Sequence, residues 1–176
     1  MTDPLSQSAQ SLPYHGADAR IAEALAARGL ALGPAPSAVA SYVPAMAIPA
    51  RAQLVVVSGQ IPIKAGHMLA TGRVGVEVSL ENAIACAECC ALNALAALKQ
   101  TVGTLDRLLQ VVKLEGFVAC DPGFADQPKV INGASDLLLE LLGEAGRHAR
   151  AAVGVPSLPL NVPVEIAFTF AVTPDE

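Results

Sequence analysis

The segment Arg150-Ala-Ala-Val-Gly-Val-Pro-Ser-Leu-Pro-Leu-Asn-Val-Pro-Val-Glu165 contains two valine-rich stretches joined by a proline-rich connection. Both stretches predict strands, the first from about His148 and the second from about Pro163. Side chains alternate between the two faces of a strand. In the second strand the bulky residues share one face, which we expect to point to a core: Val164, Ile166, Phe168, Phe170 and Val172.

The segment begins with a cation and ends with a carboxylate, and both fall among small side chains. Glu165 alternates with the bulky set, and Arg150 alternates with Val153 on the preceding strand. A guanidinium suits the binding of a carboxylate, and a carboxylate suits the handling of a proton. The alternation therefore predicts that Arg150 and Glu165 share the sheet face opposite the core, where they could form a site.

The composition favours one domain that associates with copies of itself. The chain has 176 residues, of which 53% are hydrophobic and 15% are charged. This length allows a substantial core, but so few charges cover the surface of a monomer poorly, which favours burial between subunits. The net charge of −5, the scattered basic residues and an aromatic content of 3% argue against nucleic-acid binding.

The N-terminus and the apolar runs indicate the cellular compartment, and the spacing of the cysteines bears on metal binding. The N-terminus lacks the basic and apolar regions of a secretory signal, and Pro, Gly or charge interrupts the apolar runs. We therefore expect a cytoplasmic protein without a membrane segment and with reduced cysteines. The Cys86–Cys90 cluster lies in a helical pattern without a second ligand pair, which favours helix packing over a metal site.

Along the chain, the pattern predicts the order strand, strand, helix, strand, helix, strand, strand after an N-terminal extension. Residues 1–18 are expected to form a flexible tail, 19–34 a helix with Asp18 as its cap and a linker, and 35–176 the main domain. The strands that precede the final pair are expected at 53–58, 68–74 and 108–120.

Two long helices are predicted between these strands. The first is expected to begin after Ser79 and to end at Gly103, and the second to begin near Asp126 and to end at Gly143. Small residues such as Cys90 on one side of the first helix predict a close approach of the other helix. Two helices cover one face of such a sheet, so the other face is expected to be buried by self-association.

Several motifs, taken together and in order, resemble those of the RidA/YjgF family, also labelled L-PSP endoribonucleases, and its longer bacterial subgroup in particular. Ser58-Gly-Gln-Ile-Pro62 is similar to the family's Ser-Gly-Gln-x-Pro turn. The segments 126–136 and 143–150 look like signatures of the subgroup, and Leu158-Pro159 with Val164-Glu165-Ile166 resembles the closing segment of the family. The resemblance covers about residues 35–173.

This resemblance implies a fold and an activity. The fold is an α+β, chorismate-mutase-like domain with a mixed sheet, two long helices packed on one face, and a homotrimer with clefts between its subunits. The activity is the hydrolysis of reactive 2-imino acids and their enamine tautomers to 2-keto acids and ammonia, with no cofactor and no metal. The implied partners are a small-molecule carboxylate substrate and the other subunits, without nucleic acid or membrane.

The resemblance also implies site residues. Arg150 matches the arginine that holds the substrate carboxylate, and Glu165 matches the acid that positions or deprotonates the attacking water. The other substrate-binding positions are Gly59 through its backbone N–H, Ser58 beside it, Tyr42 at the cleft, Asn132 on the second helix, and the backbone amide of Ala152. Deaminating members often carry Cys where this chain has Ala152, and a second acid where it has Ala167.

Several alternatives to an imine deaminase remain open. Arg150 could form a structural ion pair with Glu165, and the protein could bind small carboxylates as a trimer without turnover. Ribonuclease activity conflicts with the acidic charge balance. A hydrolase pair of Ser58 with His67 or His148 is disfavoured, because no Gly-x-Ser-x-Gly nucleophile elbow surrounds Ser58.

Overall fold

The structure, a computed structural model, describes residues 16–34 and 42–174, so most of the predicted N-terminal tail lies outside the described residues. It contains two units, Met1–Pro36 and Ser37–Glu176. The first unit holds helix α1 (Ala17–Ala26). The predicted cap is wrong, since Gly16 (φ 77°) occupies the cap position and Asp18 lies in the first turn.

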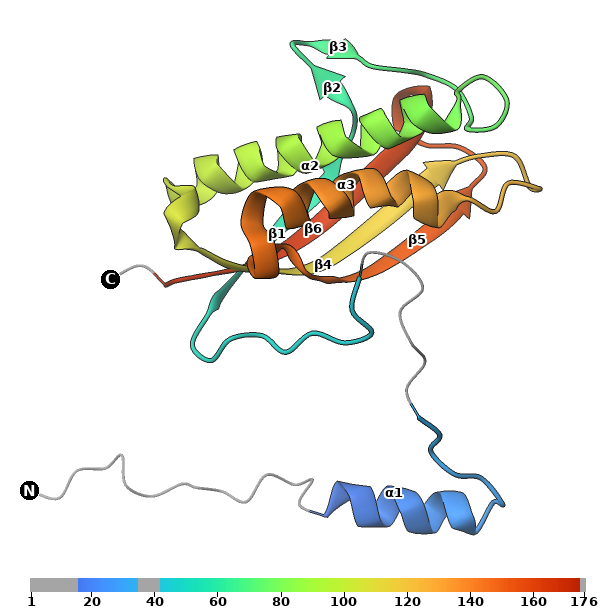
Figure 1. Ribbon diagram of the computed structural model, residues 1–176, viewed down its shortest axis with the longest axis vertical. Helices are drawn as coiled ribbons and strands as arrows, with labels where there is room; N and C mark the ends of the chain where they lie inside the picture. Colours follow the sequence, from blue (N-terminus) through green and yellow to red (C-terminus); the bar gives the residue numbers. More distant parts are fainter. Residues whose placement is uncertain (1–15, 35–41, 175–176) are drawn as a thin grey trace, which may run out of the picture. The chain divides into compact units, whose positions relative to one another are not determined.

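The second unit is built on a four-stranded mixed sheet with the order β1-β6-β4-β5. Its strands are β1 (Gln53–Gln60), β4 (Leu108–Ala119), β5 (Ala149–Val155) and β6 (Val164–Val172). Strand β6 is antiparallel to both β1 and β4, whereas β4 and β5 are parallel. The two edge strands are therefore β1 and β5, which lie at opposite sides of the sheet (Figure 1).

Two long helices, α2 (Leu80–Val102) and α3 (Gln127–Leu142), cover one face of this sheet, as predicted (Figure 1). The Ser79 hydroxyl caps α2 by accepting a hydrogen bond at 3.2 Å from the backbone N–H three residues further on. The helices end at Gly103 (φ 83°) and Gly143 (φ 58°), whose positive φ angles favour glycine. The signals for these helix ends are local, and each prediction is confirmed.

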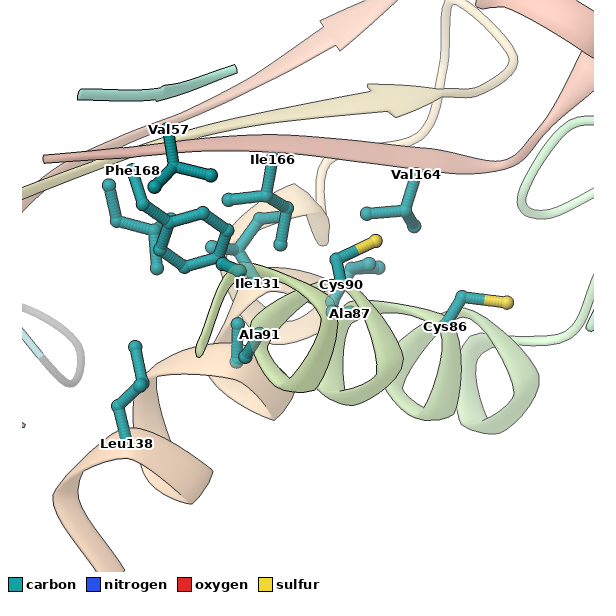
Figure 2. Packing of buried hydrophobic residues seen from close by; sticks show 14 of the residues in the cluster. Val57, Cys86, Ala87, Cys90, Ala91, Ile131, Leu138, Val164, Ile166 and Phe168 are labelled. Carbon is teal, nitrogen blue, oxygen red and sulfur yellow. The ribbon is translucent and has the colours of Figure 1, made fainter. Parts of the chain in front are cut away.

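The core lies between α2, α3 and the sheet. Ile166 and Phe168 on β6 point toward the helices, as predicted for the bulky face of this strand (Figure 2). Helix α2 meets them with small, fully buried side chains such as Ala87 and Ala91. Cys90, which we expected to face the other helix, lies on this sheet-facing side of α2, so small residues here bring helix and sheet together.

One predicted strand is absent from the main sheet. Residues 68–74 do not pair with it as a strand; instead β2 (Ile63–Lys64) and β3 (His67–Met68) form a separate two-stranded hairpin. Downstream of this hairpin, Val74 makes isolated bridges to Val78 and Cys120. The chain turns at Gly72, where φ is 110°, and this interrupts the extended conformation that the apolar pattern had suggested.

Charged residues interrupt the apolar run of helix α2, as expected, at Glu81, Glu88 and Lys99. By length and composition alone its 23 residues could nevertheless span a membrane. However, its fully buried residues pack against the sheet and α3, as those of a core helix do in a small soluble domain. Helix α2 is therefore weak evidence for a membrane span.

Candidate functional site

Arg150 lies on the helix-covered face of β5. It is in register with Leu114 on β4, which in turn is in register with Phe168 on β6, and both of these side chains are buried against the helices. Glu165 is in register with Phe117, and its neighbours along β6 on either side are fully buried. Glu165 therefore points to the open face. The two side chains of one chain therefore lie on opposite faces of the sheet, and the prediction that they share a face is wrong.

The error arose on β5, where the bulky residues do not face the core. Val153 was expected to be buried but is 44% exposed on the open face. Helix α3 begins close above β5, so the strand presents small residues to it. A Cβ atom added at Gly154 would lie 2.8 Å from Nε2 of Gln127 and 2.9 Å from Sγ of Cys120. The position of α3 therefore decides which face of β5 is covered.

The Arg150 guanidinium is half-buried and held by two hydrogen bonds to α3. Nη1 donates to Oγ of Ser135 at 2.8 Å, and Nη2 donates to the backbone carbonyl of Pro128 at 3.1 Å. Burial lowers the pKa of Arg150, while Asp136 and Tyr42 act in the opposite direction. An arginine remains charged in proteins and carries five N–H donors. Donors therefore remain for a carboxylate.

Tyr42 lies beside this guanidinium, and Ala152 lies two residues further along β5. The Arg150 Cζ atom is 5.5 Å from the centroid of the Tyr42 ring, a cation–π distance. The backbone N–H of Val43 donates to the carbonyl of His148 at 2.9 Å, and this bond attaches the Tyr42 segment to β5. Ala152 follows Arg150 on the same face of β5 and packs against the core.

Gly59, Ser58 and Glu165 form a second group, on β1 and β6. The register of β1 with β6 shifts between Val57 and Gln60, so residues 58–59 form a bulge. A Cβ atom at Gly59 would collide with the Glu165 carboxylate. The absence of a side chain thus lets this carboxylate lie directly against the β1 backbone, beside the exposed Ser58.

Asn132 lies on α3, four residues after Pro128 and three before Ser135, and therefore near the Arg150 group. It lines a groove of about 570 Å³ between α2 and α3, together with Lys129 and Asp136. Its Oδ1 atom is buried without a hydrogen-bond partner in the part of the chain that the structure describes. Within one chain, the predicted site residues therefore divide into a Glu165 group and an Arg150 group, with Asn132 on α3 next to the latter.

Burial disfavours reactivity at the three cysteines of α2. Cys86, Cys89, Cys90 and Cys120 are all buried and free. Burial raises the pKa of Cys86 to about 11 and also raises the pKa values of Cys89 and Cys90. Such thiols stay protonated near neutral pH, which disfavours both metal binding and nucleophilic attack. Among residues 16–34 and 42–174 there is no group of three or more His, Cys, Asp or Glu residues placed to hold a metal ion.

Sequence reasoning missed Ser135 and considered His148 only as a partner of Ser58. His148 instead contacts Ser135, with 2.9 Å between Nε2 and Oγ. A signal for this contact was present in the sequence. Ser135 lies two helical turns after Pro128, so both fall on one side of α3, and His148 alternates with Ala149 to share the face of Arg150.

Comparison with known proteins agrees with this fold and these motifs. Residues 22–172 match the family described as YjgF/chorismate mutase-like, putative endoribonuclease, and the chain belongs to this family. Protein TCP17 of Trypanosoma cruzi is 44% identical over 111 residues, which are 62% of this chain and 69% of that protein.

Two solved structures are similar over most of their length. The protein Atu1372 of Agrobacterium tumefaciens, described as having unknown function, is 42% identical, with 92% of this chain and 97% of that chain covered and a TM-score of 0.68. A putative endoribonuclease from Shewanella oneidensis is 35% identical, with 85% and 97% covered and a TM-score of 0.66. The resemblance stated from the motifs is confirmed at the level of the family.

Proposed function

We propose that this protein hydrolyses reactive 2-imino acids and their enamine tautomers to 2-keto acids and ammonia, in a cleft assembled from two copies of the chain in a homotrimer. The observation that supports this most strongly is the Arg150 guanidinium. It is half-buried, fixed by two hydrogen bonds and stacked near Tyr42, and it retains donors for a carboxylate. An imino acid presents such a carboxylate next to its reactive carbon.

Two copies are required because Arg150 and Glu165 lie on opposite faces of the sheet. The open face carries Glu165 among apolar side chains, including Val56 at 77% exposure and Val153 at 44%. Packing of this face against a second copy would bury these residues. It would also bring Glu165 and Gly59 of one copy toward Arg150 and Tyr42 of another.

The proposed chemistry uses each group for one task. Arg150 binds the carboxylate, and backbone N–H groups at Gly59 and Ala152 add hydrogen bonds. Glu165 accepts a proton from water as the water oxygen attacks the imine carbon. Protonated Glu165 returns this proton to the carbinolamine nitrogen. The C–N bond then breaks, ammonia leaves, and loss of the hydroxyl proton completes the C=O bond of the keto acid. Proximity and exclusion of bulk water contribute the rate enhancement.

The test is ammonia release from 2-iminobutyrate that a dehydratase generates in situ. We expect the native protein to accelerate hydrolysis, and Arg150→Ala and Glu165→Gln each to lower kcat/KM by at least about tenfold, since each removes a charged contact. Thr101→Ala, which deletes an exposed hydroxyl on the outer helix layer, is the control. A native rate equal to the background rate would refute the proposal.

The second candidate is a trimeric protein that binds 2-keto acids or other small carboxylates without turnover. Ala152 and Ala167 favour it, because this chain lacks the thiol and the second acid common in deaminating relatives. It predicts that 2-ketobutyrate raises the Tm of the native protein, but not that of Arg150→Ala, while the imine assay stays blank. No thermal shift across a panel of carboxylates would exclude it.

A further inference from the structure

We propose that Ser135 and His148 form a buried pair that positions the Arg150 guanidinium for its carboxylate. The inference rests on the proposed role of Arg150 in binding and is independent of whether the bound molecule is turned over. It assigns a function to two polar side chains, each only 1% exposed, that the proposed chemistry leaves unused. They are positioning residues, since neither is placed to touch the substrate itself.

The hydrogen bonds fix the direction of every proton in this pair. Nδ1 of His148 lies 2.7 Å from the carbonyl oxygen of Gly146, and a carbonyl only accepts, so Nδ1 carries the ring proton. In the neutral ring Nε2 is then an acceptor, and it receives the Ser135 hydroxyl proton across 2.9 Å. The Ser135 oxygen therefore directs its lone pairs away from His148, and one accepts from Nη1 of Arg150 at 2.8 Å.

These hydrogen bonds stop the Ser135 hydroxyl from rotating, so its oxygen acts only as an acceptor toward Arg150. A hydroxyl without a defined acceptor for its proton can rotate and point that proton at a neighbouring donor. His148 prevents this, because it takes the proton on the side away from Arg150. Together with the Pro128 carbonyl, which receives Nη2, the pair holds both terminal nitrogens of the guanidinium from α3.

His148 also connects the second element of the Arg150 group. Its backbone carbonyl accepts from the N–H of Val43, and this fixes the segment that carries Tyr42 over the guanidinium. One residue thus fixes the plane of Arg150 through its side chain and the neighbouring ring through its backbone. The Ser135–His148 pair contacts Nη1 of Arg150, the cation of the candidate site, and this contact supports a positioning role.

The test compares Ser135→Ala with Ser79→Ala in the full-length protein, by titration with 2-ketobutyrate. Both changes delete one serine hydroxyl, on α3 or at the start of α2. Ser79 caps α2 by accepting from the N–H of Asn82. We expect Ser135→Ala to raise the Kd about tenfold, because a charge-assisted hydrogen bond to the guanidinium is lost, and Ser79→Ala to leave it within about twofold. Ser135→Thr keeps the hydroxyl and is expected to recover most of the affinity.

Equal affinity of Ser135→Ala and the native protein would overturn the inference, and so would a native protein that binds no 2-keto acid. Native binding without imine hydrolysis would refute the proposed reaction and leave this inference standing. If Ser135→Ala does not fold, His148→Gln and nitrogen NMR of the Arg150 guanidinium replace it. Rotation about the Cζ–Nη bonds that is as slow in His148→Gln as in the native protein would contradict the positioning role.

Discussion

At the scale of single residues, the positions of Arg150 and Glu165 depend on the residues that contact them. Arg150 is useful because Ser135, Pro128 and Tyr42 fix its plane while donors stay free. Glu165 is useful because Gly59 has no side chain to displace it. Such contacts involve residues far apart in the sequence, so the motifs identified Arg150 and Glu165 but not the supporting Ser135.

The buried histidine gives a pH dependence of stability whose sign can be worked out. Burial, with a smaller contribution from Arg150, lowers the pKa of His148 below that of a solvated histidine, about 6.5. As the pH falls below about 6.5, the unfolded chain therefore binds a proton that the native protein does not. This contribution to stability is present above that pH and is lost between it and the lowered pKa.

We expect the free energy of unfolding of the native protein to fall by up to about 1.4 kcal/mol per pH unit in this window through His148 alone. His148→Gln, which cannot titrate, should show a shallower slope even though it is less stable throughout. Urea unfolding at several pH values between 7.5 and 5 measures both slopes. Identical slopes would show that His148 is not held neutral.

At the scale of helices and strands, the predictions that succeeded rest on local signals. Ser79 as a cap and Gly103 as a terminator follow from backbone chemistry within one helical turn. The face of β5 and the fate of residues 68–74 depend on long-range packing. Both were predicted incorrectly, because a short apolar pattern does not indicate which other helix or strand will pack against the segment.

The approach of α2 to α3 depends on Gly133. A Cβ atom there would collide with the backbone carbonyl oxygen of Ile84, and a backbone atom cannot move aside as a side chain can. We expect Gly133→Ala to destabilise the protein by about 1–3 kcal/mol through this overlap, despite the better helix propensity of alanine.

Gly123→Ala is the matched control, since a Cβ atom at Gly123 meets no other atom within 4 Å. Its free energy of unfolding should stay within about 0.5 kcal/mol of the native value. Urea unfolding of both variants measures the difference. Equal stability of the two would mean that the helices can separate at little cost.

At the scale of the whole molecule, the composition and the open sheet face point to the same conclusion. A chain with 53% hydrophobic and 15% charged residues leaves Val56 and Val153 exposed on the face opposite the helices. Sequence composition could indicate self-association, but it could not show that Arg150 and Glu165 lie on opposite faces of the sheet. That follows from the register of β4, β5 and β6, and it is the observation behind the proposal of a site shared between copies.

A charge on the open face should prevent assembly. We expect the native protein to sediment with three times its chain mass of 17.9 kDa and Val153→Lys to sediment as smaller species, because a buried lysine would lose its hydration. Leu141→Lys is the control, since Leu141 is 53% exposed but lies on α3. Dissociation of both variants, or of neither, would argue against assembly through this face.

The two-copy site is tested by mixing two variants of lowered activity, Arg150→Ala and Glu165→Gln, after dissociation and reassembly. If each site takes Arg150 from one copy and Glu165 from the next, every mixed trimer regains one intact site. An equal mixture should then recover about a quarter of the native rate of 2-iminobutyrate hydrolysis. Mixed trimers that form but remain as inactive as either parent would contradict a site shared between copies.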